Sequence, residues 1–322
     1  MRKSQKMNAQ EILLKKIRQI IGNETSMNEV IANILQISYD AAHRRISMKS
    51  KFSIQETVTL CQEYGISMDQ LFQKKESLIV EKTKNIKTQA DFKAYFEKSK
   101  EFLSDFNPAT CTLYYSAKDI PMNYAVTGTL FSKFKFFIWF NLLINKKATP
   151  FEDFIFDISI INETIALKQF FEYSKRVEIW NDTTINSSLQ QIYYFFESGL
   201  LQYSNAKLLL EDITKIVADL ELKCQTNTPN FQLYHNELLI LNNSVLFTSE
   251  QKLKFFLPYN ALGYYVTSDK NACLEQKEYI SNQLTNSKSL NQSGIKDQKI
   301  FFNKMRQKID FYNTKIENYV VE

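Results

Sequence analysis

The side chains that could do chemistry in this chain gather in one short segment, residues 38–47. Ala42 and Ile46 lie four residues apart, so on a helix they share one apolar side that would pack against a core. The other side chains then point outward and carry hydroxyl, carboxylate, imidazole and guanidinium groups, which can bond the edges of base pairs in a groove of DNA. They are Asp40, His43, Arg44 and Ser47, with Ser38 and Tyr39 at the N-terminal end.

Five short helices are predicted around this segment, each with its own start or stop signal. Gly22 and Gly65 end the first and fourth helices, because glycine readily adopts the backbone conformation that follows a helix. Glu29, three residues after the cap residue Ser26, would complete a capping box. The predicted helices cover residues 11–21, 27–35, 39–46, 54–64 and 68–72, and the cap residues of the last four are Ser26, Ser38, Ser53 and Ser67.

The second and third predicted helices have the spacing of a helix-turn-helix. The small side chain of Ala32 allows two helices to cross closely, and Ile37 would fill the turn between them. Residues 28–46, which read Asn-Glu-Val-Ile-Ala-Asn-Ile-Leu-Gln-Ile-Ser-Tyr-Asp-Ala-Ala-His-Arg-Arg-Ile, resemble the lambda-repressor-like helix-turn-helix family, and residues 52–72 resemble its fourth and fifth helices. The segment Ser-Tyr-Asp-Ala-Ala-His-Arg-Arg and the richness in asparagine, lysine and phenylalanine are similar to those of regulators of the Bacteroidetes group. Gln36 replaces the common turn glycine, at a cost of about 1 kcal/mol if it is left-handed.

The resemblance implies that this head binds DNA and assigns roles to its residues. Arg44 would donate to guanine, Asp40 would accept from cytosine, and Tyr39 would pack on a thymine methyl group. Ser38 joins them as a base reader, with His43 beside them. The residues implied to contact phosphate are Asn28, Arg45, Lys49 and Lys51.

Two alternatives to base reading stay open at this point. Asp40 and Arg44 are one helical turn apart, so they could pair with each other on a solvated helix, with or without DNA contacts. A helix-turn-helix can also serve protein contacts alone.

The charge of the chain is unevenly divided. Residues 1–75 hold 12 Lys and Arg against 7 Asp and Glu, whereas the remainder holds 28 of each. The whole net charge of +5 therefore lies in the first quarter, a pattern typical of a nucleic-acid-binding domain joined to a neutral one. We expect a DNA-binding domain over residues 1–75, a linker over 76–90 and a dimerisation or effector domain over 91–322.

The composition favours a mainly α protein, since glycine (6) and proline (5) are scarce. After a helix from residue 91 to the Asn107-Pro108 break, helical patterns recur over residues 126–145, 152–177, 184–203, 205–224, 271–285 and 297–317. Strand patterns occupy residues 231–234, 238–241 and 245–248, with two more over 253–257 and 263–267. A small antiparallel sheet is therefore predicted near residues 231–267, in an α+β subregion over 226–322.

The rest of the chain offers no enzymatic motif. We find no phosphate loop, no Ser-His-Asp order and no carboxylate pair with a base, so no enzyme and no cofactor are expected. His235 is expected to be structural or exposed. The cysteines are dispersed without a CxxC pair, which argues against a zinc site or disulfide framework and fits a cytoplasmic protein. Residues 130–144 are too short and too charged for a membrane span, so no membrane partner is expected.

The expected function is a sequence-specific transcription regulator that binds double-stranded DNA as a homodimer, with the recognition helix over residues 38–47 in the major groove. The aromatic clusters over residues 131–140 and 193–196 are core by default, although they could line a cavity or a dimer face. The alternative is a regulator whose C-terminal domain is a receptor for a peptide or small-molecule effector. Tetratricopeptide-type repeats would suit that role, but their spacing is not found.

Overall fold

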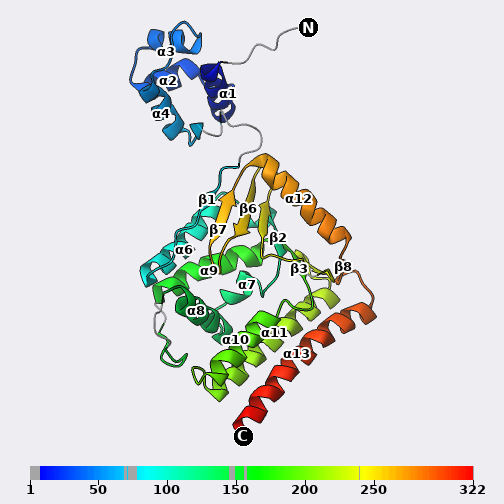
Figure 1. Cartoon of the computed structure of the whole chain (residues 1–322). Coiled ribbons are helices and arrows are strands. Elements are labelled where there is room, and N and C mark those ends of the chain that lie inside the picture. Colours follow the sequence, from blue (N-terminus) through cyan, green and yellow to red (C-terminus); the bar gives the residue numbers. More distant parts are fainter. Residues whose placement is uncertain are drawn as a thin grey trace. The chain divides into compact units, whose positions relative to one another are not determined.

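The computed structural model describes residues 8–68, 71, 78–144, 149–155, 158–238 and 240–321. The chain divides into two units, residues 1–79 and 80–322, shown in Figure 1. The first unit contains α1 (Ala9–Ile21), α2 (Met27–Leu35), α3 (Tyr39–Ile46) and α4 (Ile54–Glu63). These four match the predicted helices to within two residues at each end. The fifth predicted helix, residues 68–72, lies in part outside the described residues.

The helices of the first unit form around one apolar core. Their inward side chains come from all four helices and from the segment that follows α4, and α1 and α4 both begin with a capping box. The fully or nearly buried members are Leu13, Leu14, Ile17, Met27, Ile31, Ala42, Leu60, Cys61 and Ile66. Ile37 packs against this core from the turn, as its position between the two helices predicted.

The second unit is built on a mixed sheet of eight strands within the described residues, in the order β1-β7-β6-β5-β2-β3-β4-β8. Its central strands β2, β3 and β4 are parallel, and the other pairings are antiparallel. The strands are β1 (Glu81–Lys82), β2 (Thr112–Ser116), β3 (Lys175–Trp180), β4 (Phe231–His235), β5 (Val245–Thr248), β6 (Leu253–Pro258), β7 (Tyr264–Thr267) and β8 (Lys288–Ser289).

The prediction of a small antiparallel sheet over residues 231–267 is therefore wrong in extent and in type. Strands β4 to β7 match predicted strands, but the sheet also includes β2, which lies between two predicted helices, and β3, which begins inside the predicted helix over residues 152–177. The predicted strand at 238–241 is not formed, since Leu238 lies in a turn, residues 240 and 241 are irregular, and residue 239 lies outside the described residues. The local pattern failed at β3 because its pairing with β2 and β4, not its own periodicity, makes it a strand.

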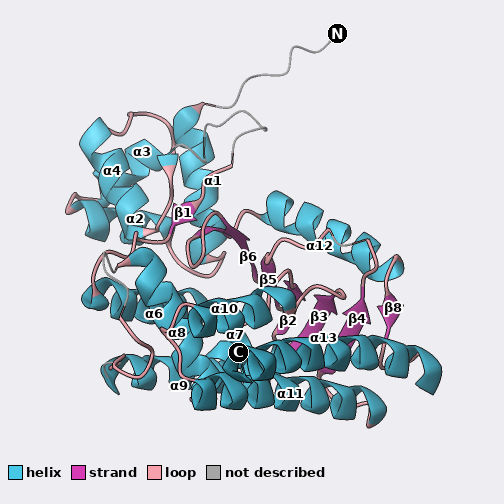
Figure 2. Cartoon of the chain, turned by 60° about the horizontal axis from the view of Figure 1, so that its bottom comes forward, coloured by secondary structure: helices cyan, strands magenta, loops and turns pink. Residues whose placement is uncertain are grey.

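The helices of the second unit cover the two faces of the sheet unequally. In Figure 2, α12 lies on one side of the sheet and most other helices lie on the opposite side. The side chains buried between the sheet and α12 include Ile179, Leu246, Cys273 and Ile280. The helices, with one 3-10 turn, are α6 (Gln89–Leu103), η1 (Pro108–Thr110), α7 (Met122–Ala125), α8 (Leu130–Leu143), α9 (Ile158–Tyr173), α10 (Asn186–Glu197), α11 (Tyr203–Gln225), α12 (Lys270–Thr285) and α13 (Ile295–Val321).

Part of the segment expected to be a linker, residues 76–90, belongs to the second unit. Within it, β1 pairs with β7, and the Thr88 hydroxyl caps α6 by accepting a hydrogen bond from Asp91 N–H. Thr83 is buried between them, where its N–H donates to the carbonyl of Tyr264. The second unit therefore begins near residue 80 and not at residue 91.

The aromatic clusters lie mostly in the main core of the second unit, with Tyr194 as an exposed exception. On α8, Phe131, Phe134, Phe136 and Phe137 are buried, and the ring of Phe137 contacts that of Phe195 with centroids 4.9 Å apart. Edge-to-face ring contacts of this kind add to the stabilisation that burial provides. Of the residues that the structure describes, no helix has the length and apolar character needed to cross a membrane.

Candidate nucleic-acid interface

Helix α3 is positioned by the turn that precedes it. Gln36 adopts the left-handed conformation, with φ of 53° and ψ of 43°, as predicted for the position of the usual glycine. The Ile37 N–H then donates to the carbonyl of Ala32 at 3.0 Å, which closes the C-terminal end of α2. Ser38 caps α3 by accepting a hydrogen bond from Ala41 N–H at 3.2 Å. The turn therefore fixes where α3 begins.

The outward side of α3 is exposed as its spacing predicted. Ala42 is fully buried, whereas all five predicted base-reading residues, Ser38, Tyr39, Asp40, His43 and Arg44, are exposed. Within the described part of the chain, the side chains of Asp40, His43 and Arg44 form no hydrogen bond or ion pair with each other or with a neighbour. The ion pair between Asp40 and Arg44 is thus not formed, and their charged groups are free to bind an external partner.

Tyr39 and Asn28 link the N-terminal ends of α3 and α2. The Asn28 Nδ2 donates to the Tyr39 hydroxyl at 3.1 Å, so a predicted phosphate contact and a predicted base reader bond each other. Tyr39 remains 52% exposed. The Asn28 Oδ1 is buried without a hydrogen-bond partner in the described residues. The pair therefore orients the Tyr39 ring at the start of the exposed face.

Arg45 differs from the other predicted phosphate contacts because its guanidinium group is engaged inside the unit. Its Nη2 and Nε donate to the Glu56 carboxylate at 2.7 and 3.2 Å, and its Nη1 donates to the carbonyl of Ala41 at 3.1 Å. Burial would raise the pKa of Glu56, but the bonds from Arg45 and Ser53 outweigh it and lower that pKa. Arg45 therefore joins α3 to α4, while Lys49 and Lys51 stay exposed.

Gln10 holds the segment after α3 in place. Its Nε2 donates to the carbonyls of Arg45 and Ser50 at 2.7 and 3.0 Å, and its Oε1 accepts from the Phe52 N–H at 3.0 Å. These bonds go to backbone groups in the last turn of α3 and in the segment that follows it. The backbone that carries Lys49 and Lys51 is consequently attached to α1.

Two of these positioning contacts are not among the sequence-based predictions. The capping box at Ser53 and Glu56 had a local signal, a serine followed three residues later by a glutamate before an apolar run. The predicted box at Ser26 is only half made, since Ser26 accepts from Glu29 N–H and the described residues contain no return bond. Gln10 had no local signal, because its partners lie 35 to 42 residues away.

The part of the chain that contains this interface also matches a known protein family. Residues 8–87 match the BetR domain, a family of helix-turn-helix DNA-binding domains. No curated protein and no solved structure matches the chain. The family match covers the first unit and the start of the second, and it supports a DNA-binding regulatory role.

Proposed function

We propose that this chain is a sequence-specific transcription regulator that binds double-stranded DNA as a dimer, with α3 in the major groove. One observation carries the proposal: on the outward side of α3 the side chains of Asp40, His43 and Arg44 have no partner among the described residues, while Ala42 anchors the helix in the core. Charged groups left unpaired on a rigidly held helix are suited to bond base edges. The match of residues 8–87 to a helix-turn-helix domain supports this use of the surface.

Each residue of the reading face has a proposed role that follows from its chemistry. Arg44 donates to guanine O6 and N7, and Asp40 accepts from the amino group of cytosine. Tyr39, oriented by Asn28, packs its ring on a thymine methyl group, and Ser38 contacts the nearest base or phosphate while capping α3. His43 lies beside Arg44 and contacts the phosphate backbone.

The phosphate contacts divide into direct and indirect ones. Lys49 and Lys51 are exposed on the segment after α3, so we assign them direct contacts. Asn28 lies at the N-terminal end of α2, where backbone N–H groups also attract a phosphate. We assign Arg45 mainly the role of holding α3 against α4, since Glu56 already accepts two of its hydrogen bonds.

The dimer follows from the small size of the reading face. One such helix contacts few base pairs, so regulators of this geometry bind two half-sites about 34 Å, one helical turn, apart. The second unit is close to neutral in charge, so two copies of it would meet without strong repulsion. We therefore assign the contact between protomers to the second unit.

Selection of bound sequences from a random DNA pool, with the full chain as bait, tests the reading face and the dimer together. We expect an enriched palindrome with half-sites about 10 base pairs apart. Sedimentation at micromolar concentration, with and without the selected DNA, reports the oligomeric state. A pool without an enriched sequence would reject sequence-specific binding, and a monomer in both sedimentation runs would reject the dimer.

A further inference from the structure

A pocket opens where the carboxyl ends of β3 and β4 meet α13, within the second unit. Its volume is about 320 Å³, and its walls come from the loop after β3, the start of α10 and one face of α13. In sheets with parallel strands, ligands characteristically bind outside the carboxyl ends of the strands. The residues that line it are Asp182, Asn186, Lys304, Gln307, Lys308, Phe311 and Tyr312.

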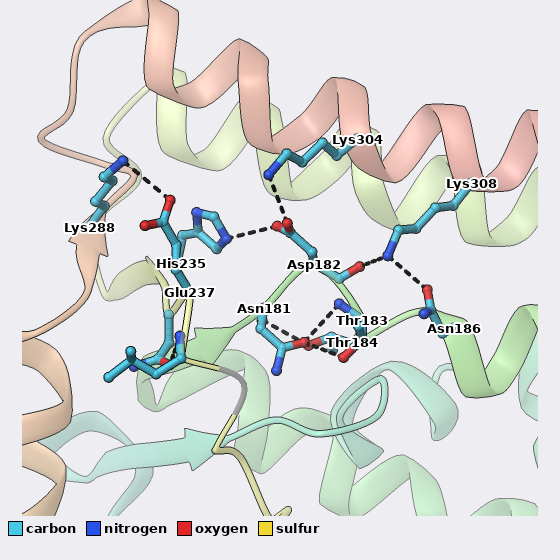
Figure 3. Close-up of polar contacts among 12 residues, drawn as sticks. Asn181, Asp182, Thr183, Thr184, Asn186, His235, Glu237, Lys288, Lys304 and Lys308 are labelled. Carbon is cyan, nitrogen blue, oxygen red and sulfur yellow. Dashed lines mark hydrogen bonds and ion pairs between the residues drawn. The ribbon is translucent and has the colours of Figure 1, made fainter.

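Asp182 is the only acidic residue among these lining residues, and its carboxylate is already engaged. Lys304 donates to its Oδ2 at 2.8 Å, and the Nε2 of His235 lies 2.8 Å from its Oδ1, as drawn in Figure 3. Burial would raise the pKa of Asp182, but Lys304 and His235 outweigh it and lower that pKa. Burial also lowers the pKa of His235, against the attraction of Asp182. The charges of Asp182 and Lys304 therefore balance each other.

Lys308 is the cation of the pocket that has no counter-ion. Its ammonium group donates to the carbonyl of Asp182 and to the Oδ1 of Asn186, which are both neutral acceptors (Figure 3). Across the part of the chain that the structure describes, no carboxylate lies within ion-pair distance of its Nζ. These two acceptors leave one of the three N–H donors of the ammonium group for a ligand or water, and neither of them neutralises its charge. The pocket therefore carries one uncompensated positive charge.

The opposite end of the pocket is aromatic. Phe311 is 60% exposed, whereas Phe301 and Phe302 of the same helix are buried. Tyr312 supports it edge to face, with ring centroids 5.4 Å apart. An exposed ring at this position offers a flat apolar surface one turn of α13 away from Lys308.

We propose that this pocket binds a small organic anion, whose carboxylate or phosphate group contacts Lys308 and whose apolar or planar part packs on Phe311. Gln307 and Asn186 supply amide groups that bond the remaining polar atoms of the ligand. The site lies wholly in the second unit, and its occupancy does not depend on the DNA-binding function proposed above.

Calorimetric titration of the full chain with phenyl phosphate and with benzoate tests the site, with benzylamine as the probe of opposite charge. We expect both anions to bind and benzylamine not to bind. Lys308→Gln should weaken phenyl phosphate binding on the order of tenfold, because a charge-assisted hydrogen bond is lost. Phe311→Ala should weaken it about two- to tenfold through the lost ring contact.

Lys299→Gln is the matched control, because Lys299 is an exposed lysine of α13 that does not line the pocket. It should bind phenyl phosphate as the wild type does. The proposal is overturned if neither anion binds, or if Lys308→Gln binds phenyl phosphate with wild-type affinity.

A measurement on the unaltered chain avoids any loss of folding in the variants. Phenyl phosphate should protect Lys308, and not Lys299, from acetylation by an amine-reactive reagent read by mass spectrometry. Equal acetylation of Lys308 with and without phenyl phosphate would also overturn the site. Arg44→Ala, which is expected to impair DNA binding, should leave phenyl phosphate binding unchanged, so the two proposals can fail separately.

Discussion

Arg45 and Glu56 connect the last turn of α3 to the first turn of α4 through two hydrogen bonds, of 2.7 and 3.2 Å. The same Glu56 carboxylate accepts a third bond from the Ser53 N–H at 2.8 Å. Both side chains of the pair are about one-fifth exposed, so solvent screens them less than it screens a surface pair. The orientation of the proposed reading helix therefore depends on a charged contact between two helices.

Glu56→Gln should destabilise the first unit by about 1–2 kcal/mol at pH 7, because both the helix cap and the bond to Arg45 are weakened. Amide hydrogen exchange of α3 and α4 in the full chain would measure the loss. Glu63→Gln, at an exposed position of the same helix, is the control and should change little. Equal exchange in Glu56→Gln and the wild type would contradict a stabilising role for the pair.

The same pair predicts a pH dependence. The pKa of Glu56 is lower in the folded chain than its ordinary value of 4.5, so its ionised form stabilises the folded state. This contribution is complete above pH 4.5 and is lost as the pH falls through the folded-state pKa. The stabilities of the wild type and Glu56→Gln should therefore converge in acid. A constant difference between them across this range would exclude the linkage.

Arg44→Ala should reduce the affinity for the selected DNA site by about 1–3 kcal/mol and relax the preference at one base position. Fluorescence anisotropy with the selected site and with single-base variants measures both effects. Lys15→Ala removes a positive charge from an exposed position of α1, outside the predicted reading face, and should retain the base preference. Wild-type affinity in Arg44→Ala would mean that α3 is not the reading helix.

Lys49→Gln and Lys51→Gln should weaken binding to all DNA sequences alike, because each removes a proposed phosphate contact. Each substitution should also reduce the slope of log affinity against log salt by about 1. Titrations at several salt concentrations provide this slope. A change in sequence preference at unchanged slope would indicate base contact by these lysines instead.

Gln36→Gly should stabilise the first unit by up to about 1 kcal/mol, because glycine adopts the left-handed conformation without the clash of a Cβ atom. The control is Lys16→Gly at an exposed position in the middle of α1, which should destabilise by about 0.5–1 kcal/mol. Thermal unfolding followed by circular dichroism ranks the three proteins. If both variants were destabilised alike, the strain at Gln36 would be negligible.

Glu178→Leu should destabilise the second unit by about 3–5 kcal/mol. Glu178 is fully buried on β3, where it accepts bonds from the Tyr124 hydroxyl at 3.0 Å and the Trp180 Nε1 at 2.9 Å and lies 3.5 Å from Arg176. Its removal leaves these donors without an acceptor. Hydrogen exchange of β2 and β3 measures the loss, and Glu172→Leu on the exposed side of α9 should change it little. A small effect at Glu178 would mean that water replaces the carboxylate.

The sequence by itself determined the four described helices of the first unit to within two residues at each end. Ser26, Ser38 and Ser53 act on N–H groups only three residues away, and Gln36 takes its backbone conformation from the turn it occupies. Apolar spacing placed Ala42 inward and Arg44 outward. Such short-range interactions depend only on residues close together in the sequence, so they can be predicted from one sequence.

The tertiary structure decided what depends on distant partners. β3 is a strand because β2 and β4 flank it, and Arg45 is engaged because α4 places Glu56 beside it. The pocket combines the loop after β3, where Asp182 lies, with Lys308 of α13, more than a hundred residues further along the chain. Contacts across such separations depend on how the elements pack, which local periodicity does not encode.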